Sequence, residues 1–286
     1  MDPEDGTVPL DESYAETVDL LGRTYQKYAL TNGTYFAPID EEEISRLELM
    51  HSVLCRVFDD RLIFPPVGSP SRILECGCGA GDWAVDVARR FPDCEVLGID
   101  LSPHMIPDDL PPNLEIQIDD LNGRFTFSPD QFDVVHSQMM AGGWCQMVEI
   151  YFNAQSDNGT LERDHGLSRW SSQYLNTLHP HKDPRAALQL PGWMRSAGFT
   201  EVESRLLTLP MCAWPSETRE RNIGAANSEN VAQLLRSLAL YPFTRLRGMS
   251  IEDFDSLVEQ ARREARDPSF KAYFPLYVCI GRKPQR

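Results

Sequence analysis

The chain has 286 residues, a formal net charge of −16 and 42% hydrophobic residues. This size allows one large α/β domain or one domain with insertions, and no apolar run reaches the roughly 20 residues of a membrane helix, so no membrane contact is expected. The negative charge repels a phosphate backbone, which argues against nucleic acid as a partner. The acidic residues 1–12 lack the apolar core of a signal peptide, so we expect a cytoplasmic location, with the nucleus as the alternative.

The seven cysteines are odd in number and lack the spacing of a disulfide framework. Cys76 and Cys78 form one Cys-x-Cys pair, but no second pair with histidine follows at the spacing of a zinc site. We therefore expect reduced thiols and no bound metal.

The first part of the chain predicts helices. One helical pattern begins near Tyr14 and ends at Asn32-Gly33. A second helix follows Asp40, a suitable N-cap residue. One face of this second helix carries Ile44, Leu47, Met50, His51 and Leu54. We predict that residues 1–64 form an acidic tail and a helical cap, which either covers a cofactor site or only buries one face of a sheet.

Residues 65–286 predict one α/β domain, in which a parallel sheet has helices on both faces. The expected strands are residues 72–76, 95–99, 114–118, 132–136 and 144–152, followed later by 202–211 and 273–281. Helical insertions are expected at about 153–197 and 215–268.

The connection between the fourth and fifth strands is unexpectedly short, because only residues 140–143 separate their apparent ends. Parallel neighbours normally need a crossover of a dozen or more residues, usually a helix. The crossover helix is missing here, either lost from the chain or omitted from the recorded sequence. A four-residue link makes a hairpin and would reverse the fifth strand. We expect a reversed or displaced strand, a partner or other segment over the bare sheet face, or an unstable and inactive protein.

A glycine-rich loop carries the clearest functional pattern. It follows strand 72–76, opens a helix at once and contains Gly77, Gly79 and Gly81. Glycines let a ligand approach the loop and the helix N-terminus closely. Asp100 ends the next strand, where an acid can accept both hydroxyls of a ribose. The G-x-G-x-G spacing differs from the dinucleotide pattern G-x-G-x-x-G, which favours S-adenosylmethionine over a nicotinamide cofactor.

Residues 73–81 and 96–102 together resemble class I S-adenosylmethionine-dependent methyltransferases. Other strings are similar to fungal methyltransferases of the secondary-metabolism regulator type, namely residues 33–35, 38–41, 46–47, 143–149, 155–159 and 274–278. The resemblance covers nearly the whole chain. It implies a Rossmann-like sheet, S-adenosylmethionine as cofactor and methyl transfer as the activity.

The resemblance also implies roles for the residues that border the cofactor. The loop glycines would border its methionine part, and Glu75 would hold the loop or the ammonium group. Asp100 would bind the ribose, and Leu101 would lie against the adenine. Asp119 or Asp120 would reach the adenine amino group, although both could instead belong to an ordinary turn.

The acceptor side is less defined by the sequence. His136 and Ser137 end the fourth strand, where such proteins face the sulfonium and the acceptor. His136 is therefore a candidate catalytic residue, with a hydrogen-bonded strand-end histidine as the alternative. Tyr25, Tyr35 and His51 are candidate acceptor-binding residues, with core packing as the alternative for the helical tyrosine.

We expect a methyltransferase that acts on a small molecule in fungal secondary-metabolite biosynthesis. Because a sulfonium is already activated, positioning supplies most of the catalysis, and a base is needed only if the acceptor loses a proton. Two alternatives stay open. One is a catalytically impaired regulatory or scaffold protein with a protein partner, and the other is an enzyme of this fold with non-methyl-transfer chemistry.

Overall fold

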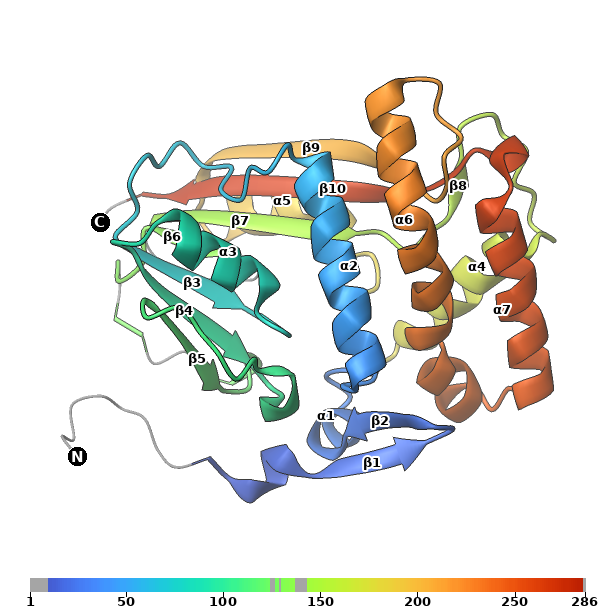
Figure 1. Cartoon of the computed structure of the whole chain (residues 1–286), viewed down its shortest axis with the longest axis horizontal. Helices are drawn as coiled ribbons and strands as arrows, with labels where there is room; N and C mark the ends of the chain where they lie inside the picture. The colour runs from blue at the N-terminus through green and yellow to red at the C-terminus, as the bar shows by residue number, and fades with distance from the viewer. Residues whose placement is uncertain (1–9, 124–126, 129, 137–142, 285–286) are drawn as a thin grey trace.

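The computed structural model describes residues 10–123, 127–128, 130–136 and 143–284. One half of its main sheet is parallel and consists of β3 (Arg72–Cys76), β4 (Glu95–Asp100), β5 (Leu114–Ile118), β6 (Val134–His136) and β7 (Gly143–Ile150). The antiparallel half consists of β10 (Ala272–Lys283), β9 (Thr200–Pro210) and β8 (Gln155–Ser156). The order is β5-β4-β3-β6-β7-β10-β8, with β9 also paired to β10. The predicted Rossmann-like α/β fold is confirmed (Figure 1).

Helices cover both faces of this sheet, as the continuous apolar runs of its parallel strands require. Helix α3 (Asp82–Arg90) packs on one face, against a cluster that includes Ile73, Val96 and Val134. Helix α5 (Ala186–Ser196) lies on the opposite face, where Leu190 and Met194 pack with residues of β7 and β10.

The expected helix from Tyr14 to Asn32 is wrong in its first part. The structure has a short 3-10 helix η1 (Glu12–Ala15), a hairpin of β1 (Thr17–Leu20) and β2 (Arg23–Gln26), and helix α1 (Lys27–Asn32). Leu21 and Gly22 both have positive φ, 51° and 77°, as a two-residue hairpin turn of type I′ requires. This turn overrides the helical spacing of the apolar residues around it. Gly33 ends α1 as expected, with φ 68°.

The expected reversal of the fifth strand is also wrong. Strands β6 and β7 pair in parallel, with Val134 opposite Trp144 and His136 opposite Gln146. The pairing covers three residues, so the chain must retrace only about 10 Å between the strands. Six residues, 137–142, lie between them, and six residues can span up to about 20 Å.

Another segment covers the sheet face that this helix would otherwise bury. Leu74 and Val135 are 0% and 2% exposed. They pack in one cluster with Phe132, and Leu121 and Phe127 lie against it. The chain between β5 and β6 therefore fills the gap, which is one of the outcomes that the short connection predicted.

The remaining helices form a second body of packed structure beside the parallel strands (Figure 1). They are α2 (Glu41–Val57), α4 (Gly166–Leu178), α6 (Thr218–Ser237), the π-helical turn η3 (Pro242–Leu246) and α7 (Ile251–Arg266). Short 3-10 turns also occur at η2 (Pro103–Met105) and η4 (Pro268–Phe270). The apolar core between the packed helices includes the fully buried side chains of Trp170, Phe243 and Phe254. No helix of the described ranges is long and apolar enough to cross a membrane.

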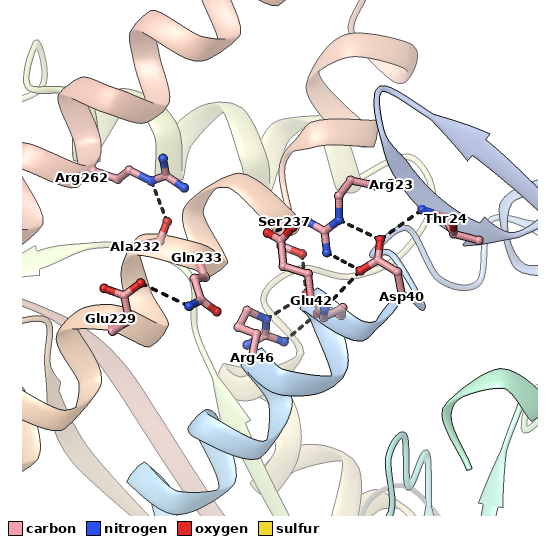
Figure 2. A network of polar contacts seen from close by, with 11 residues as sticks. Arg23, Thr24, Asp40, Glu42, Arg46, Glu229, Ala232, Gln233, Ser237 and Arg262 are labelled. Atoms are coloured by element: carbon pink, nitrogen blue, oxygen red, sulfur yellow. Dashed lines mark hydrogen bonds and ion pairs between the residues drawn. The ribbon is translucent and has the colours of Figure 1, made fainter. Parts of the chain in front are cut away.

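Helix α2 lies between the parallel strands and α6, and buried polar contacts fix it there (Figure 2). Its N-cap Asp40 accepts a hydrogen bond from the Glu43 amide and is paired with Arg23 of β2 at 2.7 Å. Within α2, the fully buried Glu43 is paired with Arg46 at 2.8 Å. Ser237 of α6 donates a hydrogen bond to Glu43. The network therefore joins the hairpin, α2 and α6.

Replacing Arg46 with alanine should leave the Glu43 carboxylate buried without its cation. We expect the free energy of unfolding to fall by about 3–5 kcal/mol, measured by urea denaturation at neutral pH. The matched control is Arg266→Ala, which breaks an exposed pair with Glu229 and should cost at most about 1 kcal/mol. Equal losses in the two variants would contradict the role of the buried pair.

Candidate active site

A cavity of about 630 Å³ lies at the carboxyl ends of the parallel strands, where ligands bind in open α/β sheets. Its walls come from the glycine loop, the ends of β4, β5 and β6, helix α2 and residues 61–64. The predicted site residues that line it are Glu75, Gly77, Gly79, Asp100, Leu101, Asp119, Asp120, Tyr35, His51 and His136. Gly81 and Tyr25 are not among the lining residues.

The glycine loop is held against the end of β4. The amides of Gly77 and Cys78 donate to the Ile99 carbonyl at 2.7 and 3.0 Å, and the Gly79 amide donates to Asp100 Oδ2 at 2.8 Å. A Cβ at Gly77 would meet no atom within 4 Å, so the backbone there is open to a ligand. At Gly81 a Cβ would lie 3.3 Å from the Ile116 side chain, so this glycine serves the packing of α3 on the sheet.

Two acids give this end of the cavity its chemistry. Glu75 is 5% exposed, and its Oε2 has no hydrogen-bond partner in the described structure. Burial, together with the charge of Asp100, raises the pKa of Glu75 well above its usual value. A buried carboxylate oxygen without a partner suits a cationic group, which fits the ammonium of S-adenosylmethionine.

Asp100 is positioned by the backbone around it. Its Oδ1 accepts from the Ser102 amide at 2.9 Å, and its Oδ2 accepts from Gly79 as described. Burial raises the pKa of Asp100, although these amides act in the opposite direction. Each carboxylate oxygen keeps further acceptor capacity, which fits the two hydroxyls of a ribose.

The other end of the cofactor region contains Leu101 and the two acids after β5. Asp119 is exposed, whereas Asp120 Oδ2 accepts from the Tyr28 hydroxyl at 3.1 Å. Burial opposes ionisation of Asp120, but hydrogen bonds from Asn122 and Tyr28 lower its pKa overall. Gln26 donates to the Leu101 carbonyl at 2.7 Å. Residues of β2 and α1 therefore contact this end of the cavity, in agreement with the expectation that the N-terminal region covers a cofactor site, although β2 belongs to a hairpin and not to the predicted helix.

Away from the glycine loop, the cavity wall carries several apolar and aromatic side chains, together with His51, Cys55, Arg61 and Asp82. Lining residues there are Met50, Leu54, Phe58, Leu62, Phe64, Trp83 and Val148. The sequence placed Met50 and Leu54 on one face of a helix, and the same spacing continues to Phe58. The other lining residues come from separate segments, so only the folded chain brings them to this wall.

His136 is held as a neutral imidazole. Its ring stacks on Trp83 with centroids 4.0 Å apart, and its Nδ1 lies 3.0 Å from Gln146 Nε2. Burial, and then the charge of His51, lowers the pKa of His136 to about 3. The buried Gln146 also accepts from the Phe64 amide and donates to the Leu62 carbonyl, both at 2.8 Å. His136 therefore lines the cavity but is a poor proton acceptor.

The three candidate acceptor-binding residues lie in different places. Tyr25 is fully buried beside Tyr241, with ring centroids 5.8 Å apart, and belongs to the core. Its expected place in an acceptor pocket is wrong, because β2 and not a helix sets its direction. Tyr35 lines the cavity, and burial raises its pKa. His51 lines it too, and its Nε2 contacts Asp86 Oδ2 at 2.8 Å.

The low pKa of His136 predicts a pH dependence of stability. The pKa of His136 is 6.5 in the unfolded chain and about 3 in the folded chain, so the folded chain takes up this proton only at a much lower pH. Stability should therefore fall as the pH drops from 6.5 towards 3, by up to about 1.4 kcal/mol per pH unit from this group. We expect His136→Asn to lose this part of the slope in urea denaturation between pH 7 and 4.5. The exposed His179→Asn is the control, and equal slopes in all three proteins would disprove the prediction.

Comparisons with known proteins agree with this site. Residues 73–152 match a family model described as a methyltransferase domain. The chain is 30% identical over 295 residues to the protein-methionine methyltransferase laeA of Emericella nidulans, covering 93% of this chain and 76% of that protein. It is also 30% identical over 290 residues to the secondary metabolism regulator laeA of Monascus pilosus, covering 92% and 77%.

Among solved structures, the chain is similar to phosphoethanolamine N-methyltransferase 2 of Haemonchus contortus in complex with S-adenosylmethionine. The TM-score is 0.47 at 18% identity, with 82% of this chain and 53% of that chain covered. The sequence identity to the laeA proteins over nearly the whole chain decides the family. The chain belongs to the laeA family of S-adenosylmethionine-dependent methyltransferases.

Proposed function

We propose that this chain methylates the thioether sulfur of a methionine side chain in a protein and thereby regulates secondary metabolism. The observation that carries the proposal is His136 at the end of β6, which lines the cavity beside aromatic side chains and is held as a neutral imidazole that accepts a proton poorly. A hydroxyl or ammonium acceptor must lose a proton, whereas a thioether sulfur has lone pairs and no proton to lose.

The cofactor end has a separate task. Glu75 would hold the ammonium group, Asp100 would hold the ribose, and Leu101 would lie against the adenine. When bound, the cofactor supplies a methyl group that is already activated on a sulfonium sulfur. The protein then contributes mainly by fixing the acceptor in line with that methyl group.

At the acceptor end, a bond forms from the thioether sulfur to the methyl carbon. The bond from that carbon to the cofactor sulfur breaks, and its electron pair stays on S-adenosylhomocysteine. No proton moves in this step. The product is a sulfonium cation, which an aromatic ring in the cavity wall, such as that of Phe58, can stabilise. The net charge of −16 also favours a cationic product over an anionic one.

The name of the Emericella nidulans relative, a protein-methionine methyltransferase, supports a protein acceptor. The small-molecule acceptor expected from the sequence is the rival, because the same apolar wall would accommodate one. A regulatory protein without methyl transfer and an enzyme with non-methyl chemistry are further rivals. Both methyl-transfer functions release S-adenosylhomocysteine, whereas the regulatory protein and the enzyme with non-methyl chemistry do not.

A peptide assay separates these functions. The purified chain is incubated with cofactor tritiated on the methyl group and with a methionine peptide, a matched norleucine peptide, or a fungal small-molecule extract. We expect label in the methionine peptide and release of S-adenosylhomocysteine, with no label in the norleucine peptide. Label confined to the extract would replace the protein acceptor with a small molecule. Cofactor binding without any label would support a regulatory role.

Glu75→Gln tests the ammonium role of Glu75 independently of the acceptor. Because burial disfavours the ionised carboxylate, we expect the ligand-free variant to melt at a higher temperature than the wild type. Its affinity for S-adenosylmethionine should fall by roughly 1.5–3 kcal/mol, the value of a hydrogen bond to a charged group, as measured by calorimetry. Glu203→Gln, at an exposed position on β9, should change neither quantity. Unchanged affinity in Glu75→Gln would remove the assignment.

A further inference from the structure

Three side chains beside the cavity bring different metal-ligating atoms together. His51 Nε2 lies 2.8 Å from Asp86 Oδ2 and 3.5 Å from Cys55 Sγ. The three ligand atoms all lie within 4.8 Å of one another. Among the residues that the structure describes, this is the one group of three or more potential metal ligands at such short range.

Helices α2 and α3 contribute the three residues of the cluster. His51 and Cys55 are four residues apart on α2, so they share one face of that helix. Asp86 lies on α3, four residues after Asp82, and the pKa of Asp82 is raised mainly by burial, with the charges of His51 and Asp86 acting on it in opposite directions. Helix α2 belongs to the cap and α3 to the sheet domain, so the cluster joins the two across the wall of the cavity.

One distance in the cluster already suits a tetrahedral ion, whereas the 2.8 Å between His51 Nε2 and Asp86 Oδ2 is a hydrogen-bond distance that would widen by about 0.5 Å around zinc. With Zn–N bonds near 2.0 Å and Zn–S bonds near 2.3 Å, the nitrogen and sulfur of a tetrahedral zinc site lie about 3.5 Å apart, and His51 Nε2 and Cys55 Sγ already have this separation. The side chains of His51 and Asp86 are 18% and 42% exposed. An ion can therefore enter without unfolding the site.

We propose that His51, Cys55 and Asp86 bind a divalent cation of the zinc type, with the fourth position open to water or to an acceptor atom in the cavity. An imidazole, a thiolate and a carboxylate together favour zinc or cobalt over magnesium and calcium, which prefer oxygen ligands. On binding, the Cys55 thiol releases its proton to solvent, and His51 carries its proton on Nδ1 while Nε2 donates a lone pair to the ion. The ion offsets the charges of Asp82 and Asp86 and ties α2 to α3.

This proposal does not rest on the identity of the acceptor. It differs from the expectation that the chain binds no metal, which was based on the spacing of Cys76 and Cys78. The histidine and the aspartate of the cluster are 35 positions apart in the chain, so no local spacing pattern reveals it.

Metal titration of the full chain tests the proposal without the cofactor. After treatment with EDTA and dialysis, the protein is titrated with zinc by calorimetry and with cobalt by absorption spectroscopy. We expect one ion per chain, a thiolate-to-cobalt charge-transfer band, and a higher melting temperature with zinc. Cys55→Ser should abolish the band and weaken zinc binding at least roughly tenfold. Asp86→Asn should weaken binding but keep the band.

The matched control is Cys94→Ser, which changes a buried cysteine outside the cluster. It should bind zinc and cobalt like the wild type. The melting temperatures of the metal-free variants check that each protein is folded. Absence of stoichiometric binding by the wild type, or equal binding by Cys55→Ser and the wild type, would overturn the proposal. Methyl transfer is not part of the readout, so a failure here leaves the proposed function untouched.

Discussion

The buried pair of Glu43 and Arg46 fixes the position of helix α2, and the cavity depends on that position. An unpaired charge at this depth costs several kcal/mol, so α2 is stable only where Arg46 and Ser237 contact Glu43 and Asn230 accepts a hydrogen bond from Arg46. Asp40 and Arg23 hold the start of the same helix against the N-terminal hairpin. With the polar groups of this network satisfied, other residues of α2, among them Met50, His51 and Leu54, line the cavity.

The cavity then has two chemically different ends. At the cofactor end, an unpaired Glu75 and a backbone-held Asp100 offer negative charge to a cationic, ribose-containing molecule. At the other end, a neutral His136 stacks on Trp83 and lies 3.0 Å from Gln146 Nε2. Gln146 connects the walls, because it holds His136 and the backbone of Leu62 at once. Such a division suits a transfer in which the methyl donor is charged and the acceptor needs no base.

The sheet tolerates an unusually short link between two parallel strands. This is possible because β6 and β7 overlap over only three residues, so the chain has little distance to retrace. The apolar face that a crossover helix would cover is buried instead by residues between β5 and β6, among them Phe132. Burial of apolar area is non-directional, and a loop with aromatic side chains can therefore replace a helix on that face.

The sequence by itself determined where the strands of the parallel half lie in the chain, the glycine loop and the acid at the tip of β4. These features depend on local patterns, namely apolar runs, glycine positions and the acid that follows a strand. It also located the cap helix after Asp40, since an N-cap residue and a helical stripe are local too. The sequence did not determine the N-terminal hairpin, where the turn at Leu21-Gly22 outweighed a helical spacing of apolar residues.

Only the tertiary structure decided which face of α2 met the cavity and which carried the buried ion pair. It also decided that Tyr25 entered the core while Tyr35 lined the site, and that β6 and β7 ran parallel. The grouping of Trp83, His136 and Gln146, and that of His51, Cys55 and Asp86, depends on contacts between distant segments. Such contacts follow from how separate elements pack and satisfy each other's polar groups, and no local pattern in a single sequence carries that information.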